Sequence, residues 1–397
     1  MKQLPKSIDI AIIGAGPQAL TLVTHLLQKR PKTRDRFLVF DGSGTWLHRW
    51  RQQFTAQEIS HLRSPAVHHP DPDPFALRSF AENRPNELFP PYDLPGTTLF
   101  EDFCQEVIRR FEVTDRVYPA SVERIVPLKP RFRVYVTGGE SVIARRVVLA
   151  TGGGIPSYPD WVGKISTPYP VDRLLHSSKV DLRAIPFRKE RVSIVGGGLT
   201  SGHLAVGAIA RGMTVKLMSR RELKEKLFDA EPGWLGPKYL KGFFAEPDFE
   251  KRWRTIRNAR DGGSLTPAMM TRLRRESRSG KIDFLERCQV REAIWRDDRW
   301  CILCENGDRH EFDRIWLATG SELNAGEHPL LSDILDTFPT RIVNGLPVLD
   351  TRLRVKGTEF FIMGGLAALQ VGPTARNLSG GIRAGRCIAE TLIKPRV

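Results

Sequence analysis

Two segments of the chain carry the glycine pattern of a nucleotide-binding turn between a strand and a helix. The first reads IDIAIIGAGPQAL from Ile8, and the second reads VSIVGGGLTSGHLAV from Val192. In each segment an apolar run suited to a buried parallel strand precedes the glycines, and apolar residues at helical spacing follow them. The pattern predicts an α/β fold with two Rossmann-like units, each able to bind a dinucleotide.

The first glycine turn has the residue types that a bound diphosphate requires. Gly14 allows the tight turn, Gly16 lets the backbone approach the diphosphate, and Ala19 lets the helix pack close to the strand. The free N–H groups at the start of the helix hold the negative charge. The next strand, RFLVFD, ends in Asp41, and an acid at that position accepts hydrogen bonds from a ribose.

The second glycine turn is followed by a different charge. Ser201 replaces the last small residue of the pattern, and the next strand, TVKLMS, leads into Ser219-Arg220-Arg221 instead of an acid. A carboxylate would repel a 2′-phosphate, whereas two guanidinium groups would bind it. The second copy therefore favours NADPH over NADH. The alternative is that the two arginines are a surface pair that happens to follow a strand.

The two halves of the chain are alike beyond the glycine turns. Each continues into short alternating segments separated by turns, and each ends in an apolar strand that leads into Ala-Thr-Gly. These tripeptides are Ala150-Thr151-Gly152 and Ala318-Thr319-Gly320. Matching order over this length indicates two copies of one plan.

Composition limits the class of protein. The 397 residues suffice for two domains, and 41% of them are hydrophobic. No run of about 18 apolar residues occurs, so a membrane span is not expected. No secretory leader precedes the first strand, which predicts a cytoplasmic protein. The five scattered cysteines do not suggest a disulfide framework. Cys301 and Cys304 have the spacing of a redox dithiol, but a strand places them on opposite faces, which favours a structural role.

The chain is strongly basic. Lys and Arg number 61 and Asp and Glu number 45, which gives a formal net charge of +16. Such a charge can attract nucleic acid. No nucleic-acid-binding module is present, however, and the basic residues are spread along the chain. A basic surface that draws in anionic cofactors is the favoured interpretation, with no nucleic-acid partner.

This plan resembles the two-dinucleotide-binding-domain flavoproteins, in which the N-terminal copy holds FAD and an inserted copy holds a nicotinamide cofactor. The resemblance implies an FAD-binding domain over residues 1–165 and 318–397 and an NADPH-binding domain over residues 166–317, the second inserted in the first. The C-terminal stretch FFIMGGLAALQVGPTARNLSGGIRAG resembles the segment that returns to the flavin. That segment would place Gly365 near FAD.

Three motifs are similar to those of class B flavin monooxygenases, and among them to the N-hydroxylating lysine and ornithine N-monooxygenases. Asp313 begins a D-x-x-x-L-A-T-G signature, in which Ser321 replaces the usual Tyr. Leu175-His176-Ser177-Ser178 resembles the H-S-S between the two nucleotide motifs. TWLHRW and HLRSPAVHHPDPDPFALRSFA look like the segments beside the flavin.

The resemblance implies an FAD-dependent, NADPH-using monooxygenase that acts on a small nucleophilic, amine-like substrate through a C4a-hydroperoxyflavin. The insert DAEPGWLGPKYLKGFFAEPDF does not match the Asn-containing substrate segment of the amino-acid hydroxylases, so lysine and ornithine are not predicted substrates. Two alternatives stay open. One is an NADPH-dependent flavin reductase or oxidase that passes electrons to a carrier or oxygen, and the other is a non-catalytic flavin-binding sensor.

Four histidines, His48, His61, His68 and His69, lie close together in the sequence. Zinc-binding spacing is absent, so a loop that lines the cavity is favoured over a metal site, and no metal is predicted. No catalytic residue and no oligomeric state is predicted. The residues predicted to bind the cofactors are Gly14, Gly16, Pro17, Gln18, Ala19, Asp41, Gly42, Trp46, Thr151, Gly152, His176, Gly196, Gly198, Leu199, Thr200, Ser201, Ser219, Arg220, Arg221, Thr319, Gly320 and Gly365.

Overall fold

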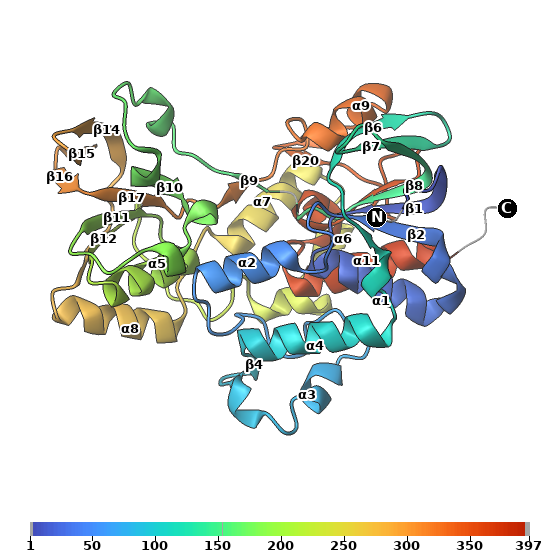
Figure 1. Cartoon of the computed structure of the whole chain (residues 1–397), viewed down its shortest axis with the longest axis horizontal. Helices are drawn as coiled ribbons and strands as arrows, with labels where there is room; N and C mark the ends of the chain where they lie inside the picture. The colour runs from blue at the N-terminus through green and yellow to red at the C-terminus, as the bar shows by residue number, and fades with distance from the viewer. Residues whose placement is uncertain (1–2, 153, 394–397) are drawn as a thin grey trace.

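A seven-stranded sheet forms the centre of the first lobe in the computed structural model, which describes residues 3–152 and 154–393 (Figure 1). Strands β5, β2, β1, β8 and β21 are parallel, and β8, β7 and β6 form an antiparallel extension. The long strand β8 serves both parts, because Ala144 pairs with Phe132 of β7 and Val147 pairs with Phe360 of β21. The strands are β1 (Ser7–Ile13), β2 (Phe37–Phe40), β5 (Val117–Tyr118), β6 (Val122–Pro127), β7 (Phe132–Val136), β8 (Ser141–Leu149) and β21 (Phe360–Ile362).

Two helices from opposite ends of the chain pack side by side in this lobe. They are α1 (Pro17–Lys29) and α11 (Leu378–Leu392). Their contact is close because Gly385 of α11 lies against the backbone of Leu22, where an added Cβ would be 3.4 Å from Leu22 N. Nine consecutive residues of α1, from Ala19 to Leu27, are buried, so this helix is part of the core of the lobe.

The second lobe contains a five-stranded parallel sheet of order β10-β17-β11-β12-β13. Helices α5 (Leu199–Ala210) and α8 (Pro267–Arg278) pack against it, and an antiparallel sheet of β14, β15 and β16 completes the lobe. The predicted α/β fold with two Rossmann-like units is confirmed, because each glycine turn joins a strand of a parallel sheet to a helix. The strands are β10 (Leu174–His176), β11 (Arg191–Val195), β12 (Thr214–Met218), β13 (Ile282–Leu285), β14 (Val290–Arg296), β15 (Arg299–Cys304), β16 (Arg309–Phe312) and β17 (Arg314–Leu317).

Two short antiparallel strands connect the lobes. They are β9 (Ile155–Pro156) and β18 (Ser321–Glu322), and Ile155 pairs with Glu322. The chain leaves the first lobe along one strand and returns along the other. The predicted domain boundaries stay a prediction, and their outer ends at residues 1 and 397 lie outside the described residues.

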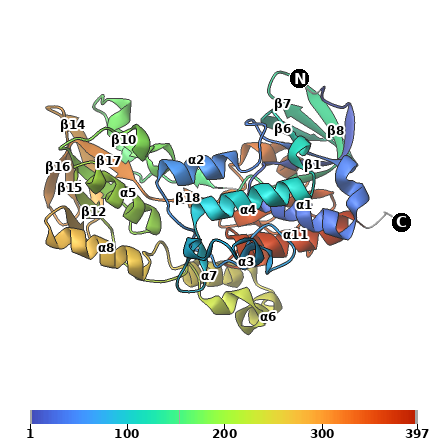
Figure 2. The same ribbon diagram turned by 60° about the horizontal axis from the view of Figure 1, so that its bottom comes forward.

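Helices α6 (Pro237–Ala245) and α7 (Phe249–Arg260) follow β12 in the chain but pack against the first lobe (Figure 2). Phe243 and Ile256 are buried in the same apolar core as β1 and α1, and Trp253 packs against that core. The remaining elements are α2 (His48–Ala56), α3 (Ala76–Phe80), β3 (Leu88–Phe89), β4 (Leu94–Pro95), α4 (Thr97–Arg110), α9 (Ser332–Thr337), β19 (Ile342–Val343), β20 (Leu346–Pro347) and α10 (Ala368–Val371). None of the helices in the described residues is long and apolar enough to cross a membrane.

The cysteines depart from expectation in one respect. Cys288 and Cys304 form a disulfide, whereas the sequence predicted no disulfide framework. The reason is the β14–β15 register, which puts Val290 opposite Cys304 and thus brings Cys288, two residues earlier, within reach. Cys301 is not bonded to Cys304, because Cys304 is on the buried face of β15 and Cys301 is on the other face.

Candidate cofactor and substrate cavity

The first glycine turn opens onto a cavity of about 760 Å³ between the lobes. Gly14 has a φ of +98°, and a Cβ there would lie 2.9 Å from the carbonyl oxygen of Ala150. Gly16 is the N-terminal cap of α1, and a Cβ on it would meet no atom within 4 Å. A diphosphate can therefore approach the backbone at Gly16 and the first N–H groups of α1.

Asp41 lies beside this turn at the end of β2. Its carboxylate accepts hydrogen bonds from the N–H of Ala15 at 3.2 Å and from the N–H and hydroxyl of Ser43 at 3.0 and 2.6 Å. These bonds fix the carboxylate at the cavity wall. In addition, Gln18 lines the cavity and its Oε1 atom lacks a partner among the described residues. The Gly14–Gly16 turn, the Asp41 carboxylate and the Gln18 side-chain oxygen fit the diphosphate and ribose of FAD.

His176, at the end of β10, lines the cavity from the second lobe. Its Nε2 is 2.9 Å from the carbonyl oxygen of Gly320, which can only accept, so Nε2 carries the proton. Nδ1 then accepts from the N–H of Ser178 at 3.2 Å. Burial lowers the pKa of His176, and the ring is therefore neutral near pH 7. The sequence predicted His176 and Gly320 as site residues, and the structure brings them together.

The opposite wall of the cavity comes from the segment that follows β12. Arg63 donates to the carboxylate of Asp229 at 2.6 Å, to the carbonyl oxygen of Leu227 at 2.8 Å and to the hydroxyl of Ser264 at 2.9 Å. The Arg63 side chain is 13% exposed, so this network ties residues 226–264 to the loop before α3. Phe228 and Leu235 add apolar surface to the same wall.

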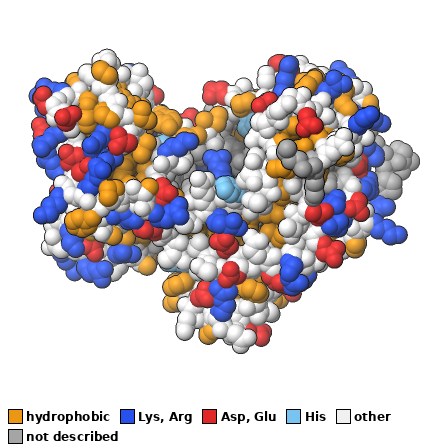
Figure 3. Space-filling model, viewed as in Figure 1, with side chains coloured by type: hydrophobic (Ala, Val, Ile, Leu, Met, Phe, Trp, Pro, Cys, Tyr) orange, Lys and Arg blue, Asp and Glu red, His pale blue; other side chains and the backbone are white. Residues whose placement is uncertain are grey.

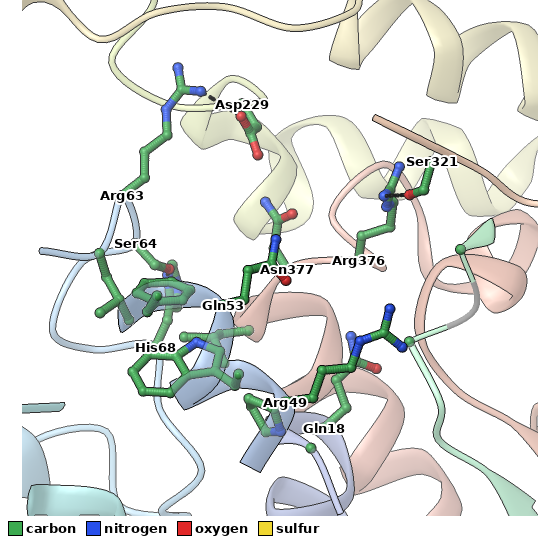
Figure 4. A pocket seen from close by; sticks show the side chains of 18 of the residues that line it. Gln18, Arg49, Gln53, Arg63, Ser64, His68, Asp229, Ser321, Arg376 and Asn377 are labelled. Atoms are coloured by element: carbon green, nitrogen blue, oxygen red, sulfur yellow. Dashed lines mark hydrogen bonds and ion pairs between the residues drawn. The ribbon is translucent and has the colours of Figure 1, made fainter. Parts of the chain in front are cut away.

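A second arginine faces the cavity and has no acidic partner in contact among the described residues. Arg376 donates to the hydroxyl of Ser321 at 2.6 Å, and Figure 4 shows this pair across the cavity from Arg63 and Asp229. Burial lowers the pKa of Arg376, with a further contribution from the charge of Arg260. The guanidinium is still charged at neutral pH, since arginine does not lose its proton in proteins.

The predicted site residues divide into those in this cavity and those elsewhere. Ten of them line it: Gly14, Gly16, Pro17, Gln18, Asp41, Thr151, Gly152, His176, Thr200 and Gly320. Trp46 does not, because its ring is in the core and its Nε1 donates to the carbonyl oxygen of Val113. The others off the cavity are Ala19, Gly42, Gly196, Gly198, Leu199, Ser201, Ser219, Arg220, Arg221, Thr319 and Gly365.

The histidine-rich loop does not form a metal cluster. His48 and His68 line the cavity, and burial lowers the pKa of His68 to about 4. His61 stacks on Phe89, and His69 is buried against Phe103. Within residues 3–152 and 154–393, the one group of three His, Cys, Asp or Glu side chains close enough to share a metal ion is Cys288, Cys304 and His310.

The second glycine turn is covered rather than open. Gly196 has a φ of +141°, and a Cβ on it would lie 2.3 Å from the carbonyl oxygen of Ala318. Gly198 faces Gly263, and a Cβ on Gly263 would lie 2.7 Å from the Cα of Gly198. Only the start of α5, at Thr200, reaches the cavity from this turn. The small residues fit a dinucleotide turn, and the covering segment comes from the end of α7.

Several cavity residues carry no local sequence signal. Arg63, Asp229, Arg376, Asn377 and Gln53 were not singled out, because they lie in loops or helices that only the folded chain brings together. Figure 3 shows the hollow between the lobes, with Lys or Arg and His side chains at its walls. In the sequence, the one indication of positive charge at these walls is the overall excess of basic residues.

The fold and the cavity define a two-dinucleotide-binding flavoprotein. An FAD-NAD(P)-binding family model matches residues 11–154, and an L-lysine 6-monooxygenase/L-ornithine 5-monooxygenase model matches residues 94–321, more than half of the chain. The chain therefore belongs to the lysine/ornithine monooxygenase family. It is an FAD- and NADPH-dependent member of the N-hydroxylating flavin monooxygenases.

Solved structures share this fold at low sequence identity. The ornithine hydroxylase of Pseudomonas aeruginosa is 18% identical, with 97% of this chain and 98% of that chain covered and a TM-score of 0.77. The ornithine N-hydroxylase of Kutzneria sp. 744, solved with reduced FAD, NADP⁺ and L-ornithine, is 18% identical over 97% and 99%, with a TM-score of 0.79. The FAD-bound cadaverine monooxygenase of Erwinia amylovora is 15% identical over 98% and 95%, with a TM-score of 0.77. No curated protein matches the chain significantly.

Proposed function

We propose that this protein N-hydroxylates a small amine in the cytoplasm, with FAD held by the first glycine turn and NADPH by the second. The observation that carries the proposal is one cavity lined by residues of both nucleotide-binding units: Gly16 at the start of α1, Thr200 at the start of α5, and the His176–Gly320 pair between them. A hydride donor and a flavin must meet in such a shared space.

The protein would contribute binding, orientation and a dry cavity. Bound FAD would supply the oxygen-transfer chemistry and NADPH the reducing equivalents. The N–H groups at the start of α1 and the Asp41 carboxylate would hold the diphosphate and a ribose of FAD. Trp50, Phe54 and Phe228 line the cavity and would keep water from the reacting atoms.

The charge of the cavity supports an amine that reacts as the free base. Only an unprotonated amine has the lone pair that accepts an oxygen atom. Within the part of the chain that the structure describes, Arg376 is a cation with no acidic partner in contact, whereas Arg63 is neutralised by Asp229. A nearby guanidinium disfavours the ammonium form of a bound amine and so lowers its pKa. His68 is uncharged at neutral pH because burial lowers its pKa to about 4.

The wall formed by Phe228 to Leu235 supports a substrate that differs from lysine and ornithine, because its sequence does not match the substrate segment expected of those hydroxylases. The solved ornithine and cadaverine enzymes share the fold, and they make aliphatic amines the first class to test.

The test is to purify the protein with FAD and supply NADPH, oxygen and a panel of primary amines that includes cadaverine, putrescine, lysine and ornithine. NADPH oxidation, hydroxylamine and hydrogen peroxide are measured together. We expect one amine to yield hydroxylamine in proportion to the NADPH consumed. If peroxide accounts for all the NADPH with every amine, the protein is an oxidase. If NADPH leaves the flavin oxidised, it is a non-catalytic binder.

A further inference from the structure

Three cations surround one carboxylate beside the second glycine turn. The side chain of Asp261 contacts Lys224 Nζ directly, Lys226 Nζ at 3.4 Å and a terminal nitrogen of Arg221 at 3.9 Å. Lys224 and Lys226 are two residues apart in an extended segment, which places their side chains on one face. Since a single carboxylate carries one negative charge, the cluster retains a surplus of positive charge.

Asp261 is held in this position by the backbone at the end of α7. It caps the helix in the left-handed region, with a φ of 46°, and the next residue, Gly262, has a φ of +71°. A Cβ on Gly262 would lie 1.7 Å from the Arg221 guanidinium, so the segment runs close over that side chain. Gly263 then packs on Gly198 of the second glycine turn. Residues 261–263 therefore cover both the turn and the cation cluster.

We propose that Arg221, Lys224 and Lys226 form the binding site for the 2′-phosphate of NADPH, and that Asp261 occupies this site until the cofactor displaces it. The inference rests on the proposed use of NADPH by the second unit, and it adds Lys224, Lys226 and Asp261 to the residues expected from the sequence.

Charge and geometry explain why the 2′-phosphate would bind the three cations in preference to Asp261. A phosphate monoester carries between one and a half and two negative charges near pH 7 and has three acceptor oxygens, so it can bind three cations at once. The Asp261 carboxylate accepts hydrogen bonds from Lys224 and, at 3.4 Å, from Lys226, but its nearest distance to Arg221 is 3.9 Å. The hydrogen bond from Lys224 holds the pKa of Asp261 below its usual range, so the carboxylate is charged at neutral pH.

The movement that frees the site is confined to a few residues. Leu265 is anchored by two backbone hydrogen bonds of 2.9 Å, one to Lys224 and one from Lys226. Asp261 is the last residue attached to α7. Gly262 and Gly263 lie between these fixed points and can adopt backbone angles that other residues cannot. The three cations thus stay in place while the Asp261 side chain turns away and Gly262 and Gly263 shift.

The test is equilibrium binding of NADP⁺, NAD⁺ and 2′,5′-ADP to the FAD-loaded protein by calorimetry. Asp261→Asn keeps a residue that tolerates the left-handed region and removes the charge. We expect it to tighten NADP⁺ and 2′,5′-ADP by about fivefold, the size of one exposed charge interaction, and to leave NAD⁺ unchanged. Asp283→Asn is the matched control, because Asp283 pairs only loosely with Lys216, at 3.9 Å, on a neighbouring strand.

A second variant tests the cations themselves. Lys224→Gln combined with Lys226→Gln should weaken NADP⁺ and 2′,5′-ADP by about tenfold, again without changing NAD⁺. Unchanged NADP⁺ affinity in Asp261→Asn, or equal loss of NADP⁺ and NAD⁺ in the lysine variant, would overturn the inference. If the wild-type protein binds neither NADP⁺ nor 2′,5′-ADP, the proposed function fails instead, so the two failures are distinguishable.

Discussion

The two glycine turns share one plan but differ in what covers them. The first is open: a Cβ on Gly16 would meet nothing within 4 Å, and the cavity begins there. At the second, Gly263 lies against Gly198, and Asp261 sits among the nearby cations. The first turn ends near an acid and the second near bases. A repeated motif therefore fixes the local backbone, while access and charge come from segments inserted elsewhere.

The largest effect should follow a change in the open turn. Gly14→Ala combines a left-handed backbone, which costs about 1 to 3 kcal/mol, with a Cβ contact on the Ala150 carbonyl. We expect FAD content after purification to fall about tenfold or more. The control is Gly138→Ala, which has a similar φ of +91° but open space around its Cβ. Equal FAD loss in both variants would mean that stability, not the turn, is responsible.

The covered turn should respond differently. Gly196→Ala would place a Cβ 2.3 Å from the Ala318 carbonyl oxygen, so we expect NADP⁺ binding to weaken by about tenfold while FAD content stays normal. Gly307→Ala, in the β15–β16 turn, is the control, since its φ is +90° and its surroundings are open. Calorimetry and the flavin absorbance give the two readings. Loss of FAD in Gly196→Ala would contradict the assignment of FAD to the first turn and NADPH to the second.

The link between the covering segment and the first lobe depends on Arg63. Arg63→Met removes the Arg63 donor from Asp229 and from three carbonyl oxygens, which should lower the free energy of unfolding by about 2 kcal/mol. Hydrogen exchange should rise most in residues 224–265. Arg124→Met, which removes an exposed pair with Asp333, should change little. Uniform exchange across the chain would show that Arg63 does not fasten this segment.

The smallest effect concerns the charge at the shared cavity. Arg376→Gln removes a cation that depresses the pKa of a bound amine, so the amine should lose its proton at higher pH. The rising limb of the kcat profile, which reports the enzyme–substrate complex, should therefore move up by about one pH unit. Arg376→Lys retains the charge and should leave the limb in place. If the rising limb of the pH profile does not move in Arg376→Gln, the guanidinium acts on another group.

Much of the fold could be predicted from the sequence because its signals are local. The apolar run, the glycines and the acid at Asp41 are contiguous or separated by one helix, and such spacing determines a strand-turn-helix-strand unit. Gly320 and His176 were also predicted, since each belongs to a short motif, and the structure joins them by a hydrogen bond of 2.9 Å.

The rest depends on distant pairings that no local pattern encodes. Arg63 and Asp229 are 166 positions apart, and they meet only because α6 and α7 pack back on the first lobe. Cys288 and Cys304 meet through the register of a hairpin. Trp46 illustrates the converse, because its place in a flavin-like motif suggested the cavity, whereas its indole N–H is bound to Val113 in the core.

The return of α6 and α7 to the first lobe also limits how this chain can be rearranged. Because β9 pairs with β18, the two ends of the segment between them are adjacent. This pairing alone suggests that the segment could be exchanged between relatives by recombination. An exchange at Pro156 and Ser321 would, however, carry away Phe243 and Ile256 and uncover the apolar core that they help to close. A chimaera would therefore need donor and recipient surfaces that already match.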